Sequence, residues 1–382
     1  MKCHIVPEVY LKSWKIPECK NSIFIFDKQN IKTPIQSNIS NLKNTYFVAE
    51  DIYILKTNNE NYTEKLKDDF CILYNSLINY SISFNNTLIT TLEDFLLYYS
   101  SIDNWIIHDK YNNPIECLEV QKSLEQLWDK NVAKLIENYF DSYLENRWNV
   151  FLDYINNELI SKKTWIIKPK LKEYFLEFAS IQFCRRYENL KGFGLDFAVN
   201  FFLQFLKDSL PKNVTENTEN AEDYKKDLIL IELYRYVKNI NPNIISHTYD
   251  IINSDMQVCF LIAPPHIEFI TSDNPFIYLS LSNQYPKYYS GMFLPINRNI
   301  CTYICKNTGG SMLNKYLILS PSYANVKFIN HLIKSHSINH VAYCMPSIDQ
   351  LLSKYPDTEG WKEMLGDVGL VYTDDLQPSI DS

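Results

Sequence analysis

The stretch MQVCFLIAPPHIEFITSDNPFIYL, residues 256–279, decides how this chain folds. Its first eight residues and the run IEFIT at 267–271 are rich in apolar, β-branched and aromatic side chains, which favour strands. A Pro-Pro-His turn at 264–266 separates them, so we predict a hairpin. The second strand then meets Ser, Asp, Asn and Pro at 272–275, which bond the local backbone or lack a donor and so end strands. The stretch predicts a β region that ends in a polar corner.

The strand-like pattern continues toward the C-terminus. Four further runs have the residue types and lengths of strands, and they are followed by a helix and a last strand. The predicted strands are 276–281, 291–295, 300–305, 316–319 and 340–344, and the predicted helix is 322–336.

Toward the N-terminus, the pattern is helical between about residues 63 and 237. The clearest helix is 170–189, because Phe175, Phe178, Ala179 and Gln182 lie on one face at the helical period. The polar run 211–223 has no apolar period and is predicted to be a loop. The other predicted helices are 63–77 with Thr63 as N-cap, 116–140, 143–159 and 224–238.

Short strands at 22–27 and within 46–55 form the beginning of the chain, and they are too short to fold alone. Helices in series followed by strands in series favour an α+β fold rather than a parallel α/β sheet. We therefore predict a short N-terminal β region, a central helical bundle and a C-terminal mostly antiparallel β-sheet with one helix. The predicted regions are 1–60, packing on the C-terminal sheet, 61–250 and 251–382, joined in one integrated globular unit.

Charge and cysteine content restrict the class of protein. The net charge of −8 repels polyanions, so nucleic acid would need a local basic patch, such as the lysines at 162–172 or Arg185–Arg186. Nine cysteines form no paired framework, which favours the cytoplasm, and no run is apolar enough to span a membrane. The chain has no Walker A, GxGxxG, GxSxG or HExxH motif.

The polar corner is the first candidate site. It presents Ser272 and Asp273 as candidate catalytic residues and Asn274 as a candidate substrate-binding residue at the end of a strand. A purely structural turn is the alternative interpretation of the same residues.

The helix at 170–189 carries the second set of candidates. Gln182 and Arg186 continue the apolar face, so at least one of the guanidinium groups of Arg185 and Arg186 is expected to point inward. A buried guanidinium requires an acceptor, and Asp273 would serve. These three side chains are candidate substrate-binding residues; the alternative is an arginine satisfied by the carbonyls at the helix end.

Two further candidates have weaker support. His4, in HIVPEVYLKSW, is a candidate catalytic residue if the aromatic side chains of Tyr10 and Trp14 fix the terminus at the site. Glu64 lies about one helical turn before Asp68 or Asp69, a spacing that would suit a divalent metal ion, the one cofactor that the sequence suggests. A helix dipole also favours acidic residues in a first turn, which is the alternative.

HIVPEVYLKSW, IFIFDK, ASIQFCRR, FITSDNPF, FLPI and Asn330 before a terminal strand together resemble the bacterial domain-of-unknown-function family 4238. The family pattern opens with His-x-x-Pro-x-x-Tyr-Leu and contains Thr-Ser-Asp-Asn-Pro, and the resemblance covers nearly the whole chain. It adds Asn330 to the candidate substrate-binding residues and implies no mechanism. The chain has Glu64 with Asp68 or Asp69 where the family commonly has two glutamates.

Two functional hypotheses follow. The first is an intracellular hydrolase, a metal-dependent nuclease of a phage-defence or mobile-element system, with Asp273 near a divalent ion and Arg185 or Arg186 on a phosphate. The second is a non-catalytic binding or regulatory protein in which His4, Arg186 and Asp273 form a buried network. Partner and oligomeric state are not indicated by the sequence.

Overall fold

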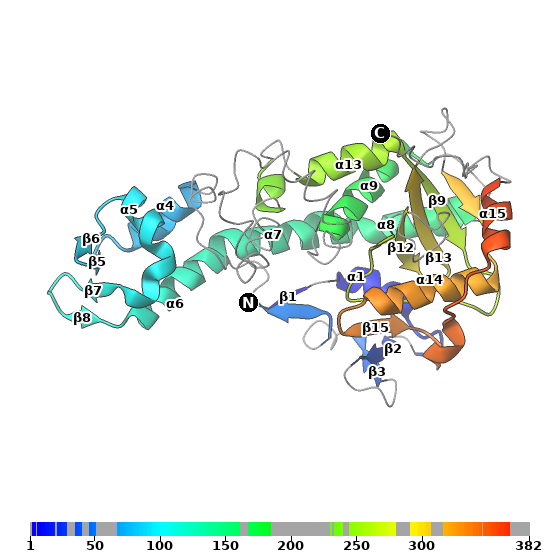
Figure 1. Ribbon diagram of the computed structural model, residues 1–382, viewed down its shortest axis with the longest axis horizontal. Coiled ribbons are helices and arrows are strands. Elements are labelled where there is room, and N and C mark those ends of the chain that lie inside the picture. The colour runs from blue at the N-terminus through cyan, green and yellow to red at the C-terminus, as the bar shows by residue number, and fades with distance from the viewer. Residues whose placement is uncertain are drawn as a thin grey trace, which may run out of the picture. The chain divides into compact units, whose positions relative to one another are not determined.

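The computed structural model has an α+β fold and separates into two compact units (Figure 1). Unit 1 comprises Met1, 50–140 and 198–243, and unit 2 comprises 2–49, 141–197 and 244–382. The structure describes residues 2–4, 6–19, 21–28, 35–39, 46–50, 67–160, 167–184, 230, 233–239, 244–279, 291–306, 316–345 and 347–366. The predicted loop at 211–223 lies outside these residues, and the predicted region boundaries at 60 and 250 remain predictions.

A five-stranded sheet forms the centre of unit 2. Its strands are β9 (Met256–Ile262), β11 (Ile277–Leu279), β12 (Gly291–Asn297), β13 (Ile300–Lys306) and β14 (Leu317–Leu319), in the order β11-β12-β13-β9-β14. All pairs are antiparallel except β14 with β9. Both faces are buried, so its strands are apolar throughout rather than alternating.

A second sheet of unit 2 joins the beginning and the end of the chain. Its strands are β2 (Ser22–Asp27), β3 (Ile35–Asn38), β10 (Thr271–Ser272) and β15 (His340–Tyr343), in the order β10-β15-β2-β3. The β2–β15 pair is antiparallel and places Ile25 opposite Ala342. A separate pair joins β1 (Lys2–His4) and β4 (Val48–Glu50).

The hairpin predicted for 256–271 is wrong. β9 pairs along its whole length with β13, whereas only Thr271 and the following Ser272 enter a strand, opposite β15. Two prolines cannot supply the positive φ angles of a tight hairpin turn, and the chain leaves β9 without folding back on it. The run 267–270 is instead held by hydrogen bonds to distant parts of unit 2.

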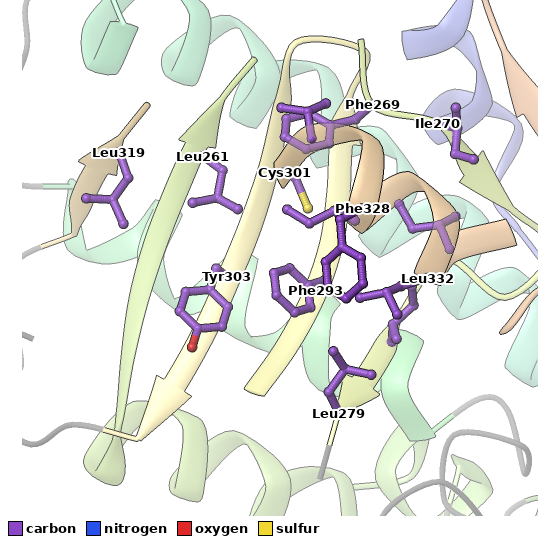
Figure 2. Close-up of a cluster of buried hydrophobic side chains, with 14 of the residues drawn as sticks. Leu261, Phe269, Ile270, Leu279, Phe293, Cys301, Tyr303, Leu319, Phe328 and Leu332 are labelled. Atoms are coloured by element: carbon purple, nitrogen blue, oxygen red, sulfur yellow. The ribbon is translucent and has the colours of Figure 1, made fainter. Parts of the chain in front are cut away.

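The main core of unit 2 lies between the two sheets and the helix α14 (Tyr323–His336), which Ser322 caps through its side-chain oxygen. Figure 2 shows Phe328 and Leu332 of α14 beside Phe293 of the five-stranded sheet. η7 (Ile348–Leu351) and α15 (Thr358–Gly366), which we did not predict, add Leu351 and Trp361 to this core.

Helices cover the opposite face of the five-stranded sheet. The ring of Phe175, on α9 (Pro169–Cys184), lies 6.0 Å from that of Phe260 on β9. Cys184 at the end of α9 contacts Thr248 on α13 (Ile244–Asp255). This arrangement confirms a helical region and a C-terminal sheet. No helix among the described residues is long and apolar enough to cross a bilayer.

Helical residues run without a break from Cys117 to Ile160, although we predicted an interruption between 140 and 143. The elements are α6 (Cys117–Trp128), η3 (Asp129–Ala133), α7 (Lys134–Tyr139), η4 (Phe140–Glu145), α8 (Asn146–Tyr154) and η5 (Ile155–Ile160). η3, η4 and η5 are π-helical.

The apolar pattern of this run explains its π-helical segments. Buried side chains recur at every fourth residue, at positions 120, 124, 128, 132, 136, 140, 144 and 148. An α-helix has 3.6 residues per turn, so such a stripe would rotate by about 40° at each step and by roughly 280° over seven steps. A π turn accommodates one more residue and reduces this rotation. The mixture keeps the stripe buried, a feature that no α-helical period would predict.

Unit 1 contains two hairpins where we predicted only helices. β5 (Ser81–Phe84) and β6 (Thr87–Leu88) form one, and β7 (Ile106–His108) and β8 (Pro114–Ile115) form the other, in the order β6-β5-β7-β8. The strands are so short that their alternation is not visible in the sequence. They pack with α4 (Lys67–Ser76), α5 (Leu92–Tyr98), η2 (Tyr99–Asn104) and α6 around Phe70, Phe95 and Trp128.

The turn between β5 and β6 yields a prediction. Asn85 and Asn86 both have positive φ (49° and 64°), as a two-residue type I′ turn requires. We expect Asn86→Val to destabilise this hairpin by about 1 to 2 kcal/mol, because a β-branched residue is disfavoured in that conformation. Asn86→Gly should leave it as stable or more so. Amide hydrogen exchange of residues 81–88 measures both, and equal exchange in the two variants would contradict the assigned turn.

Candidate functional site

The candidate site is the extended segment 268–274, all of which is buried in unit 2. Phe269 donates its backbone N–H to the carbonyl of Arg298 at 2.7 Å, and Asp273 donates its own to the carbonyl of His340 at 3.0 Å. Between these bonds the β10 residues Thr271 and Ser272 lie opposite Ala342 and Val341. The segment therefore runs from the turn between β12 and β13 of the five-stranded sheet into the second sheet.

The N-terminal aromatic residues hold this segment by their polar ends. Tyr10 lies on α1 (Glu8–Leu11) and Trp14 on η1 (Lys12–Trp14), and both are buried. The hydroxyl of Tyr10 donates to the carbonyl of Pro295 and accepts from Thr271 Oγ1 at 3.0 Å; Trp14 Nε1 donates to the carbonyl of Phe269 at 2.9 Å. Burial raises the pKa of Tyr10 well above its usual value, so the hydroxyl stays protonated.

Asn330, on α14, holds the same segment from the other side. Its Nδ2 donates to the carbonyls of Glu268 and Leu351 at 2.8 and 3.1 Å, and its Oδ1 accepts from the N–H of Ile270 at 3.0 Å. The side chain is completely buried. An amide here replaces the missing strand partner of residues 268–270, since backbone groups in a dry core need hydrogen bonds.

The carboxylate of Asp273 binds the loop between α14 and β15. Its Oδ1 accepts from the N–H of Ile338 at 2.9 Å, and its Oδ2 accepts from Asn339 and His340 at 2.8 and 3.1 Å. The residue is 2% exposed. Three backbone donors stabilise the charge of a buried carboxylate, and the same bonds fix the path of the chain from the helix into the strand.

Ser272 and Asn274 bond mainly to backbone. Ser272 Oγ donates to the carbonyl of Asn274 at 2.7 Å and accepts from its N–H at 3.2 Å. Asn274 Nδ2 donates to the carbonyl of His336 at 3.3 Å, while its buried Oδ1 has no hydrogen-bond partner among the described residues. The corner therefore also closes the C-terminal end of α14.

Glu268 is a buried acidic residue that we did not predict as part of the site. Its Oε1 accepts from the N–H groups of Cys344 and Met345, at 2.7 and 2.8 Å. Burial raises the pKa of Glu268, and these two bonds and the charge of Arg298 oppose that shift. Burial also raises the pKa of Cys344, whose thiol donates to the carbonyl of Trp14 at 2.8 Å.

Two titratable side chains lie near Asp273: Lys28, whose Nζ donates to the carbonyl of Ser337 and interacts with the Asp273 charge, and His340. Its Nδ1 is 3.8 Å from Asp273 Oδ2, too far for a hydrogen bond, and its ring meets Tyr46 edge-on at 5.3 Å. The imidazole is 16% exposed. Asp273 and His340 thus lie close together without a hydrogen bond between their side chains.

The other predicted site residues are placed as follows. Gln182 is buried on α9, and its Nε2 has no hydrogen-bond partner in the described part of the chain. The ring of the next residue, Phe183, meets that of Phe276, two residues beyond Asn274, edge-on at 5.1 Å. Arg185 and Arg186 follow α9 and lie outside the described residues, as does Glu64. His4 is in β1 and Asp69 in α4, and the side chains of both are outside the description. Their roles stay predictions.

The described residues contain no group of three or more His, Cys, Asp or Glu side chains placed to hold a metal ion. Asp273 and Glu268, the buried carboxylates of the segment, bind N–H groups with the oxygens that a hard cation would require. Of the predicted candidates, the structure brings together Ser272, Asp273, Asn274 and, through Ile270, Asn330.

Asp273 yields a stability prediction. Removing its carboxylate leaves three buried N–H groups without an acceptor, so we expect Asp273→Ala to cost about 3 to 5 kcal/mol of unfolding free energy. Asp273→Asn keeps one acceptor oxygen and should cost less. The exposed Asp153→Ala is the control, within about 0.5 kcal/mol of the parent. Chemical denaturation and amide exchange at 338–340 measure these effects, and equal costs for the three variants would refute the role of the carboxylate.

Glu268 yields a pH prediction. Its pKa is higher in the folded chain than in the unfolded one, so its contribution to stability is complete below the unfolded pKa and is lost as pH rises through the folded value. Glu268→Gln keeps an oxygen for the two N–H groups and cannot ionise. The melting temperature of the variant minus that of the parent should therefore increase as pH rises from the ordinary pKa of a glutamate through the raised folded value. Glu363→Gln, at an exposed position on α15, should show no such trend.

Comparison with known proteins identifies the family of this chain. No curated protein and no solved structure matches the chain significantly. One family model does match, and its match covers residues 2–346, from β1 to beyond β15, so it includes α1, the 268–274 segment and Asn330. The chain therefore belongs to the family described as "Protein of unknown function (DUF4238)".

Proposed function

We propose that this protein is a non-catalytic binding or regulatory protein, and that its Thr-Ser-Asp-Asn corner is a structural clamp. The observation that carries the proposal is the hydrogen bonding of Asp273. Its two carboxylate oxygens already accept three backbone N–H groups inside the core. A carboxylate that works as a base or a metal ligand needs a lone pair directed at the reacting group. Here the bonded lone pairs are directed at the chain itself.

The neighbouring side chains support the same proposal. Ser272 is completely buried, and its hydroxyl donates to a carbonyl rather than to a base, so it is not activated as a nucleophile. Thr271 and Asn330 also bond to partners inside the fold. The eight cysteines for which the structure describes a state are free thiols, which supports a cytoplasmic location.

One observation favours the hydrolase hypothesis as a second candidate. His340 lies 3.8 Å from Asp273 with part of its ring exposed, and a carboxylate that orients an imidazole is a common general-base arrangement. In this proposal His340 takes a proton from water or from a substrate hydroxyl, and Asp273 orients the ring. A nuclease of a phage-defence system would be one such enzyme, and Arg185 or Arg186 would be its phosphate ligand.

A single experiment separates the two proposals. The purified full chain is incubated with plasmid DNA, with RNA and with a chromogenic phosphodiester, in Mg²⁺ and in Mn²⁺, beside its His340→Gln variant. We expect the rates to be equal, since a structural corner has no base to lose. A matched control is His108→Gln in β7, far from Asp273 in the sequence and part of the other unit.

A loss of turnover in the His340→Gln variant would decide for the enzyme proposal. If turnover falls by about 10²- to 10⁴-fold in His340→Gln while His108→Gln and the melting temperature are unchanged, the enzyme proposal replaces the structural one. Asp273→Asn then becomes the second test, because loss of the orienting group should slow turnover by more than its effect on stability explains.

A further inference from the structure

The sheet of unit 1 carries an exposed apolar face that the clamp does not explain. In its strand register, Ser83 of β5 lies opposite Leu88 on β6 and opposite Ile106 on β7. Directly opposite residues share one face of a sheet, so these three form a row. The neighbouring row, Ile82 with Ile107, is buried and faces the core. Leu88 and Ile106 are 58% and 54% exposed.

Exposed apolar side chains are concentrated in this part of the chain. Eleven large hydrophobic side chains are exposed among the described residues, and eight of them fall between residues 72 and 118. Tyr111, in the turn between β7 and β8, and Leu118, at the start of α6, are two more of them, at 73% and 55% exposure. Single exposed leucines are ordinary, whereas Leu88 and Ile106 share one face of the sheet and form an exposed apolar row, which is the kind of surface that binds another molecule.

The charge of the same region indicates what that molecule is. Residues 70–128 contain seven carboxylates, at 93, 94, 103, 109, 116, 119 and 125, and two lysines, at 110 and 122, for a net charge of −5. The other 323 residues together carry the remaining −3. Glu116 and Glu119 are exposed on both sides of Leu118. The apolar row therefore belongs to a strongly negative region of the chain.

We propose that the outer face of the β5–β8 sheet, defined by Leu88, Ser83 and Ile106, is a docking site for a basic segment of another protein that also carries apolar side chains. Such a segment supplies charge of the opposite sign and covers the exposed row, and electrostatic complementarity steers it to this face. Nucleic acid and anionic membranes are repelled by the same charge, as is a second copy of the chain. The proposal is independent of the clamp, because none of these residues belongs to it.

The test uses a synthetic amphipathic peptide of lysine and leucine as the probe, with the full chain as its target. We expect the double variant Leu88→Ser, Ile106→Ser to weaken binding about tenfold or more, since it removes the apolar contacts at the centre of the face. Both side chains point to solvent, so the melting temperature should not fall. Val150→Ser with Tyr355→Ser, also exposed, is the matched control and should bind like the parent.

The charge of the region is tested separately. Glu116→Gln with Glu119→Gln should weaken peptide binding at low salt and should have little effect at high salt, because exposed charges are screened. A peptide with glutamate in place of lysine should not bind. Fluorescence anisotropy gives the affinities, and hydrogen exchange of the full chain should show protection at residues 81–88 and 106–115.

Three results would overturn the proposal. The first is that the peptide of lysine and leucine does not bind. The second is that the peptide protects other parts of the chain from hydrogen exchange and that the Leu88, Ile106 double variant and its control lose equal affinity for it. The third is a concentration-dependent dimer that the Leu88, Ile106 variant abolishes, because this would make a second copy the occupant.

Discussion

The bonds of the Asp273 carboxylate are the constraint on which unit 2 depends. They join residues that are about 65 positions apart in the sequence, and they fix the point where α14 ends and β15 begins. β15 in turn pairs with both β10 and β2, so the position of the second sheet follows from this loop. A disulfide or a metal ion would rarely hold three backbone amides together through so few residues.

Around this carboxylate, side chains replace the backbone ladder that a longer strand would have provided. Segment 268–274 enters a strand for only two residues, yet Tyr10 and Trp14 near the N-terminus and Asn330 on α14 satisfy several of its remaining polar groups from two distant parts of the sequence. Through this network the N-terminal helices α1 and η1 become part of the core. A polar corner usually exposes its Ser and Asn side chains to solvent, whereas Ser272 and Asn274 are buried here.

Much of this could be predicted, because strong local patterns decide it. β9 and β13 are long apolar runs, α14 and α9 are long and periodic, and the α+β class follows from their order. The residues of the corner and Asn330 were also identified, and they do lie together. The predictions that were wrong depend on partners distant in the sequence or on very short elements. The hairpin predicted for 256–271 does not form because β9 pairs with β13 instead. The strands β5 to β8 were not predicted because they have too few residues to show a period. The role of Glu268 was invisible because one acidic residue in a strand-like run has no pattern.

The run from Cys117 to Ile160 has a consequence for how this family can vary in length. A π turn is what remains when one residue is inserted into an α-helix and the rest of the helix keeps its phase. Since η3, η4 and η5 each accommodate such an extra residue, a relative could lose one there and regain a regular turn locally. Removal of one residue within 129–133, 140–145 or 155–160 should therefore restore a regular α-helical turn there and leave the phase of the following residues unchanged.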